Sequence, residues 1–268
     1  MPLKSEAAVN QNSSPSVKVI NNANKGRPKA ADYDLDVRAV LETAIEIYCA
    51  ILLMENPFPT SVQEVDWAKN AWSLAGHHHN IKLSHDGGIL KLIVARSTHL
   101  RGQFKSKARP IVTTTFGFEM SADTGVQTRN HLLVSELKQD SAFIFRARGS
   151  SLDEHTGLYT NPVIQQVINE VLFKNKSDDG IKWAKYYNPF PRVAFALTLT
   201  AIECAIDEWA SGSREMISFK EDEYSGVFNS HLASLDEFSK AAGKLDLLFG
   251  VRAVRTCKRE TQTNEKEV

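Results

Sequence analysis

The chain has 268 residues, and its 32 Lys and Arg residues balance its 32 Asp and Glu residues, so the formal net charge is zero. This balance excludes a molecule-wide electrostatic field for nucleic acid or membrane, and any such attraction must come from a local patch. Hydrophobic residues make up 42% of the chain and charged residues 24%, which is the composition of a soluble globular protein. The length allows one large domain or two small ones around a sizeable core.

The cysteines and the N-terminal composition bear on the cellular compartment. Cys49, Cys204 and Cys257 are odd in number and widely spaced, without a C-x-x-C pair. Cys49 and Cys204 fall within apolar helical patterns, where a free thiol packs as a small hydrophobic group. The N-terminal segment contains no apolar core of a signal peptide. We therefore expect an intracellular protein, cytoplasmic or nuclear, in a reducing compartment.

Most of the chain carries the 3.6-residue hydrophobic period of α-helices. Residues 1–31 are rich in Asn, Ser, Lys and Pro and lack this period, which predicts a disordered basic and polar arm. Residues 256–268 predict a disordered charged tail for the same reason. Residues 32–255 predict a mainly α, single compact domain of about seven or eight helices with at most one short β-hairpin.

The predicted helices of the first half are bounded by prolines and capping residues. The first is predicted over 34–55, and the prolines of the N-P-F-P stretch at 56–59 stop it. The second begins at Ser61, because Ser61 and the glutamate three residues later have the spacing of a capping box. The third is predicted over 88–108, with Pro110 ending it.

The second half of the chain predicts further helices around one aromatic interruption. Segments 141–149 and 156–160 are short, aromatic and flanked by Gly and Ser, so they are candidates for the hairpin. Asn161 and Pro162 supply the N-cap and first-turn proline of a helix. The other predicted elements are a helix at 126–139, a second N-P-F-P stop at 188–191, a central helix from 193 and a last helix over 220–242.

Several stretches are similar to those of one protein family. They are WAKNAWSLA, HLRGQFKSKAR, GLYTNPVIQQVINEVLFKNKSDDG, YYNPFP and LTAIECAIDEWASG. In this order, over roughly Asp32 to Ala241, they resemble a domain-of-unknown-function family, number 6532 of that series, from mushroom-forming fungi. The resemblance implies a fungal, intracellular, helical domain, and it brings no established activity, cofactor or catalytic residue. Function must therefore be argued from a site.

Two carboxylates on the central helix are the first candidate site. The apolar run from Val193 is interrupted by Glu203, Asp207 and Glu208, and these charges argue against a membrane span. Glu203 and Asp207 lie one helical turn apart on an otherwise apolar helix, so they need cations, a shared proton or a metal. The favoured interpretation is an internal ion-pair network with Arg101. The alternative is an acid–base or metal site.

A basic stripe is the second candidate. In a continuous helix Lys91, Arg101, Lys105 and Arg109 share one face, and no acidic residue lies between Gly87 and Phe118. Such a stripe can follow phosphates, or it can be a solvated face that suits the helix C-terminus. If Arg101 neutralises the carboxylates of the central helix, it is not available to nucleic acid.

The N-terminal arm holds a third candidate, the stretch KGRPKA with Lys25, Arg27 and Lys29. A Gly-Arg-Pro core between lysines resembles an AT-hook, whose arginine enters a narrow minor groove. A basic linker ahead of a domain has the same composition. The arm could equally favour nuclear import.

The histidine run at 77–79, with His85 close by, is the most conspicuous motif of the chain. Consecutive helical residues point about 100° apart, so three adjacent histidines do not converge on one metal. We expect the run to lie at a fraying helix end or in a loop, and the less favoured alternative is a surface metal site that includes His85. The chain also lacks the motifs GxGxxG, GxxxxGK[ST], HExxH and GxSxG.

These observations favour a non-enzymatic, α-helical interaction module without a cofactor. We expect it to bind a protein partner and to act beside nucleic acid through its basic arm. The alternative is a hydrolase or nuclease in which Glu203, Asp207 and His231 hold a divalent metal of undefined identity.

Overall fold

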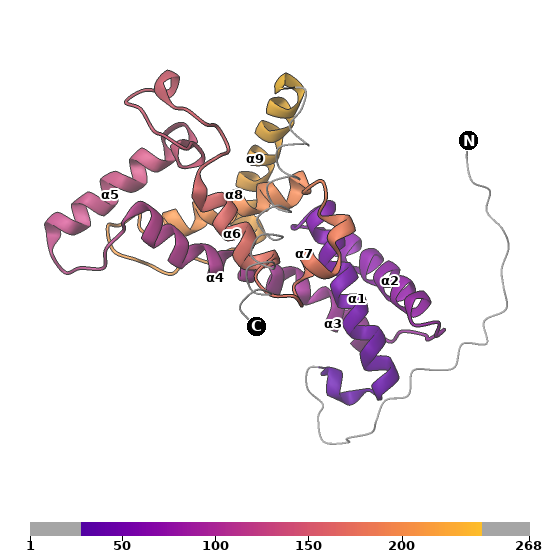
Figure 1. Ribbon diagram of the computed structural model, residues 1–268. Coiled ribbons are helices and arrows are strands. Elements are labelled where there is room, and N and C mark those ends of the chain that lie inside the picture. The colour runs from indigo at the N-terminus through magenta and orange to yellow at the C-terminus, as the bar shows by residue number, and fades with distance from the viewer. Residues whose placement is uncertain (1–27, 243–268) are drawn as a thin grey trace, which may run out of the picture. The chain divides into compact units, whose positions relative to one another are not determined.

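A computed structural model describes residues 28–242, and within these residues the protein is built from α-helices and short turns (Figure 1). Over residues 28–242, eight helices have eight or more residues, and α7 is a single turn. The described residues contain no strand, so the prediction of a mainly α fold is confirmed. Most of the predicted arm and the whole of the predicted tail lie outside the described residues.

The described chain divides into two compact units, which are treated separately below. The first comprises residues 28–48 and 60–96, and the second comprises residues 49–59 and 97–242. The single domain expected from the sequence stays a prediction. No helix among the described residues combines the length and the apolar character needed to cross a bilayer.

The first unit contains the 3-10 turn η1, most of α1, and helices α2 and α3. Their bounds are Ala30–Asp32 for η1, Leu35–Met54 for α1, Ser61–His78 for α2 and Gly87–Val94 for α3. α1 buries the predicted apolar face, including Val37, Leu41 and Ala44. Asp86 caps α3 by accepting from the Ile89 N–H at 2.8 Å, and the same carboxylate oxygen accepts from the Tyr33 hydroxyl at 2.8 Å.

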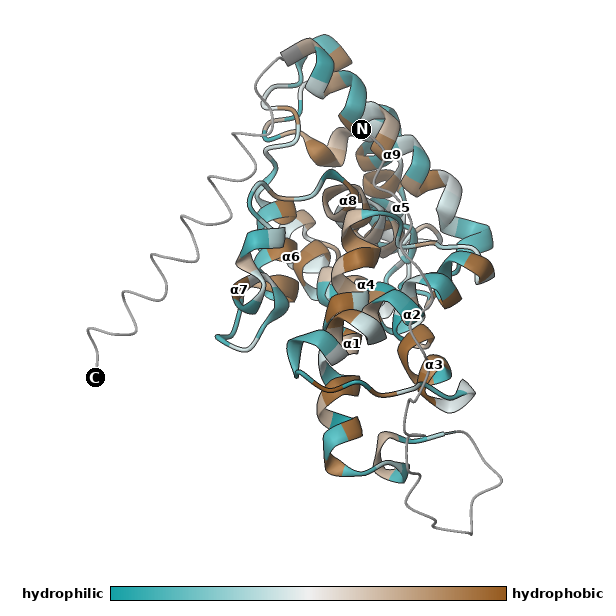
Figure 2. Ribbon diagram, turned by 90° about the vertical axis from the view of Figure 1, so that its right-hand side faces the viewer, coloured by the Kyte–Doolittle hydropathy of each residue, from teal (hydrophilic) through white to brown (hydrophobic). Residues whose placement is uncertain are grey.

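The second unit is organised around α8. Its elements are α4 (Arg96–Phe116), α5 (Thr124–Lys138), η2 (Gln139–Ile144), η3 (Leu152–Glu154), α6 (Pro162–Leu172), α7 (Asp179–Lys182), η4 (Ala184–Tyr186), α8 (Arg192–Asp207) and α9 (Glu221–Ala242). α8 packs against α5, α6 and α9. Every residue from Ala194 to Ile202 is buried, and Figure 2 shows α8 as strongly hydrophobic. The prediction of a buried central helix is confirmed.

Three predicted boundaries differ from those observed. The cap of α2 is Thr60, which pairs reciprocally with Gln63, so the overlapping T-x-x-Q motif is used one residue before the predicted S-x-x-E. The predicted third helix is interrupted at Ala95, between α3 and α4. Pro110 does not end α4, because a proline removes only one backbone donor and Val112 beyond it is fully buried.

The predicted hairpin is reduced to one antiparallel bridge between Ala147 and Thr156. The apolar residues before it do not form a strand, because Ala142, Phe143 and Ile144 belong to the 3-10 segment η2 and are buried. The conformation of these aromatic, β-favouring residues is thus set by their burial next to α5 and not by their intrinsic preference for strands. The predicted start of α6 is confirmed, since Asn161 caps it and Pro162 is its first residue.

The histidine run ends α2 in a defined way. Asn80 has a left-handed φ of 54°, and its N–H donates to the His77 carbonyl at 3.1 Å. The Ile81 N–H donates back to the Gly76 carbonyl at 2.9 Å. These two bonds form a Schellman motif, with Asn80 in the position that glycine most often fills. The run therefore lies at a capped helix end, where the sequence predicts a fraying one.

Candidate functional site

The carboxylates of Glu203 and Asp207 lie at the edge of the buried surface of α8. Their side chains are 15% and 19% exposed, and the residues around them on α8 are buried. The side chains that contact them come from α5 and α9. The sequence-based expectation is that both acids need cations, a shared proton or a metal as partners.

All four carboxylate oxygens of this pair have a partner. Lys138, the last residue of α5, places its Nζ 2.5 Å from Asp207 Oδ1 and 3.4 Å from Glu203 Oε1. His231 of α9 donates from Nε2 to Glu203 Oε2 at 2.8 Å. The Tyr224 hydroxyl, also from α9, donates to Asp207 Oδ2 at 3.1 Å. We call these five residues the Lys138 cluster.

The partners hold Glu203 and Lys138 in their charged forms. Burial alone would raise the pKa of Glu203, but the hydrogen bond and charge of His231 and the charge of Lys138 outweigh it and lower that pKa. Burial would likewise lower the pKa of Lys138, but the hydrogen bond and charge of Asp207, with Glu203, raise it. Burial, then Cys204 and Asp207, raise the pKa of Tyr224. The Tyr224 hydroxyl therefore acts only as a neutral group.

A second ion-pair cluster lies one residue further along the chain. The side chain of Glu208 is fully buried and binds Arg109 of α4, whose Nε lies 2.8 Å from Oε2 and whose Nη2 lies 2.6 Å from Oε1. Lys105 lies 2.9 Å from Oε1 and also donates to the Ile217 carbonyl. Burial opposes ionisation of Glu208, but the bonds from Arg109 and Lys105 lower its pKa. We call this the Glu208 cluster.

Cys204 joins the two clusters. Its thiol hydrogen-bonds with Tyr224 of the Lys138 cluster and with Lys105 of the Glu208 cluster. Burial is the largest influence on this thiol and raises its pKa, so it stays protonated near neutral pH. One turn of α8 is thereby linked through polar side chains to α4, α5 and α9.

The structure changes the predicted partners of the carboxylates. The charge next to Glu203 and Asp207 comes from Lys138, whereas Arg101 donates to the Pro57 carbonyl at 2.7 Å and stacks over the Phe58 ring. Sequence reasoning missed Lys138 and Tyr224 as partners, and Glu208 as a site of its own. The position of Glu208 in a buried apolar run was the available signal, because a buried carboxylate requires a cation.

The basic candidates on α4 are engaged inside the second unit. Arg101 and Lys105 are buried, and Arg109 binds Glu208. Lys91 belongs to α3, so the predicted stripe is interrupted. Among the arm candidates, Lys29 is exposed and directly precedes η1, with its N–H donating to Asp32. Lys25 and Arg27 lie outside the described residues.

Within residues 28–242, no three His, Cys, Asp or Glu side chains are grouped so that they could hold a metal ion. The ammonium of Lys138 already lies between the two carboxylates of the Lys138 cluster, and the His231 ring donates to Glu203. A cation bound there would have to displace Lys138.

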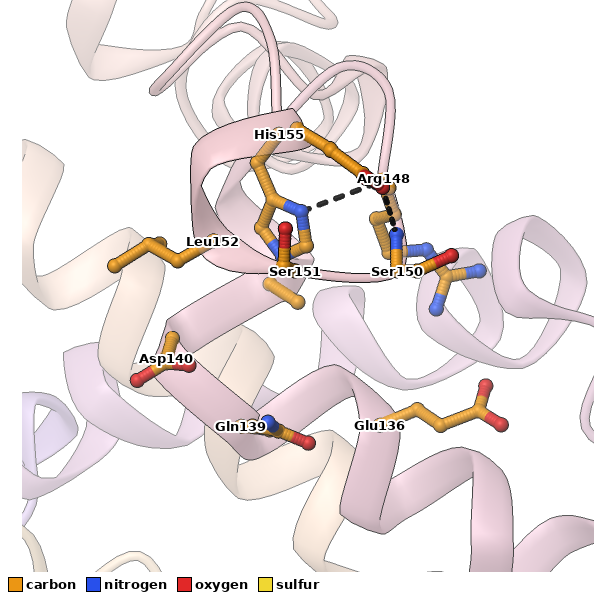
Figure 3. A pocket seen from close by; sticks show the side chains of 11 residues that line it. Glu136, Gln139, Asp140, Arg148, Ser150, Ser151, Leu152 and His155 are labelled. Carbon is orange, nitrogen blue, oxygen red and sulfur yellow. Dashed lines mark hydrogen bonds between the residues drawn. The ribbon is translucent and has the colours of Figure 1, made fainter.

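A pocket of about 690 Å³ lies elsewhere, between the end of α5 and the loop before α6 (Figure 3). Ser151, His155 and Asp140 line it together, which raises the question of a nucleophile–base pair. The Gly149 N–H donates to His155 Nδ1 at 3.1 Å, so the neutral ring carries its proton on Nε2. The free side of the imidazole is therefore a donor, and it does not accept a proton from a serine.

The sequence was compared with protein families, curated proteins and solved structures. Residues 43–238 match the model of the family described as Domain of unknown function (DUF6532). The chain belongs to this family. No curated protein and no solved structure matches the chain. The DUF6532 match covers the whole of α8 and every residue of both ion-pair clusters, and it supplies no activity for them.

Proposed function

We propose that this DUF6532 protein is an intracellular, non-enzymatic interaction module that binds a protein partner and contacts nucleic acid through its basic N-terminal arm. The observation that carries the proposal is the complete pairing of the four carboxylate oxygens of Glu203 and Asp207. Carboxylates bound in this way link neighbouring helices, which favours a structural role over proton transfer or metal binding. Within the described residues Cys49 and Cys204 are buried and form no disulfide, which supports a reducing compartment.

The nucleic-acid part of the proposal rests on the arm, since the basic residues of α4 are engaged internally. Arg101 and Lys105 are buried, and Arg109 is bound to a carboxylate. A segment such as KGRPKA, by contrast, can follow a narrow minor groove as an extended chain.

Binding to an AT-rich duplex tests the arm. We expect the substitution of Lys25, Arg27 and Lys29 by alanine to weaken binding and to reduce the slope of log K against log salt by about 0.9 for each lost phosphate contact. A control variant removes three exposed basic residues elsewhere, Arg146, Arg148 and Lys176. Equal binding by both variants, or an affinity that salt does not change, would overturn the nucleic-acid contact.

The alternative function is a metal-dependent hydrolase or nuclease built on Glu203, Asp207 and His231. Metal analysis of protein without an affinity tag separates the two functions. We expect no stoichiometric divalent metal, because Lys138 occupies the space between the carboxylates. One equivalent of metal that is lost on Asp207→Ala, in a variant that stays folded, would overturn the non-enzymatic proposal.

A further inference from the structure

A groove of about 720 Å³ runs along the C-terminal end of α2, inside the first unit. It exists because the chain turns back at Asn80 and residues 81–85 run beside the helix. Gly76 permits the close approach, since a Cβ at this position would lie 2.8 Å from the Ile81 carbonyl oxygen. The Trp72 indole N–H fixes the returning segment by donating to the Leu83 carbonyl at 3.1 Å.

Four cationic or imidazole side chains line this groove. Lys69 and His77 come from α2, and Lys82 and His85 come from the returning segment. All four residues are exposed, and within the described residues none of their side chains makes a hydrogen bond or ion pair. No Asp or Glu lines the groove. The carboxylate of Asp86, next to His85, binds Tyr33 and caps α3.

This charge distribution favours a negatively charged ligand. Two imidazoles alone would suit a transition metal, but two lysines in the same groove repel any cation. Each lysine ammonium group is a donor only, and each imidazole has at least one N–H donor, so the four groups suit an anion with several acceptor oxygens. A phosphate monoester has this chemistry, and a singly charged carboxylate would use fewer of the four groups.

The floor of the groove is apolar and indicates that the ligand also has an organic part. Ile81, Leu83 and the ring of Trp72 line it, and Trp72 is held by its own hydrogen bond. The volume of about 720 Å³ is far larger than a phosphate ion needs and lies in the range of small-molecule sites. We propose that the groove is a binding site for a small organic phosphate monoester, with the phosphate between Lys69 and Lys82 and the organic part on the apolar floor.

Calorimetric titration of the full chain with AMP, inorganic phosphate and adenosine tests this site. We expect AMP to bind with a Kd of about 1 mM or lower, phosphate to bind more weakly and adenosine not to bind. Lys69→Gln and Lys82→Gln should each weaken AMP binding about tenfold, because each removes a charge-assisted contact. Lys91→Gln, an exposed lysine of α3 outside the groove, is the matched control.

Each result decides the proposal. No saturable heat with AMP at about 10 mM would overturn it. AMP binding that survives the double substitution of Lys69 and Lys82, or that is lost when Lys25, Arg27 and Lys29 are replaced, would place the anion elsewhere. Equal affinity for AMP and phosphate would overturn the proposal of an organic ligand, because the adenosine part would then contribute nothing to binding. The glutamine variants change exposed side chains, and circular dichroism checks that they keep the helical fold.

Discussion

At the scale of single residues, Lys138 neutralises two carboxylates although its own side chain is 37% exposed. It is shared by two carboxylates one turn apart, which would repel each other without it. The sequence predicted that Glu203 and Asp207 need partners, because unpaired buried charge is costly. It could not predict which cation is used, since Lys138 lies 69 positions from Asp207 and only the packing of α5 against α8 brings them together.

The substitution Lys138→Met tests this sharing. We expect the free energy of unfolding to fall by about 1–2 kcal/mol, less than for a fully buried pair because the Lys138 side chain is 37% exposed. Urea denaturation measures the change. Lys174→Met is the control, because Lys174 binds only the partly exposed Glu170 and should cost about 0.5 kcal/mol or less. An equal loss in both variants would show that Lys138 is an ordinary surface lysine.

At the scale of helices, local signals predicted most elements, and long-range packing decided their ends. Asn161 with Pro162 marked the start of α6 correctly, because capping depends on neighbouring residues alone. The prediction that Pro110 ends α4 is wrong, because the local effect of the proline is outweighed by the burial of Val112 beyond it. The ordered end of α2 was missed because its cap uses Asn80 in place of the commoner glycine.

Two helical glycines are predicted to respond to alanine with opposite signs. Gly76→Ala should destabilise the protein by about 1–2 kcal/mol, because the added Cβ would press on the Ile81 carbonyl and force residues 81–85 outward. Gly102→Ala, on α4 with open space around the position, should stabilise it by up to about 1 kcal/mol through helix propensity. Thermal denaturation of both variants compares the signs, and a stabilised Gly76→Ala would contradict the close packing.

At the scale of the whole molecule, the two ion-pair clusters predict how stability depends on pH. The pKa values of Glu203 and Glu208 lie below the ordinary 4.5, so the unfolded chain takes up protons first as the pH falls. Their contribution is therefore complete above about pH 5 and is lost as the pH falls through the lowered pKa values. The pKa of Lys138 lies above 10.5, so its contribution is complete below about pH 10 and is lost as the pH rises through the raised pKa.

Urea midpoints measured from pH 3 to pH 7 at constant ionic strength should therefore fall steeply below about pH 4.5 and stay level above it. Glu203→Gln should flatten this acid limb by removing one titrating group. Glu215→Gln, an exposed residue outside both clusters, should leave the limb unchanged. If Glu203→Gln leaves the fall of the urea midpoint below about pH 4.5 unchanged, the role given to this carboxylate is contradicted.

We expect the polar turn at the end of α8 to favour one packing of this helix over those in which it is rotated or shifted along its axis. A nearly uniform apolar cylinder can rotate about its axis or slide by a turn at little cost, since most of its sides bury equally well. Residues 203–208 restrict both movements, because their polar contacts with α4, α5 and α9 form at only one rotation and one position of α8 along its axis. Replacing Glu203, Asp207, Lys138 and His231 by Met, Leu, Met and Phe should therefore keep the helical content but broaden the amide NMR signals. A sharp spectrum from this variant would show that shape alone orients the helix.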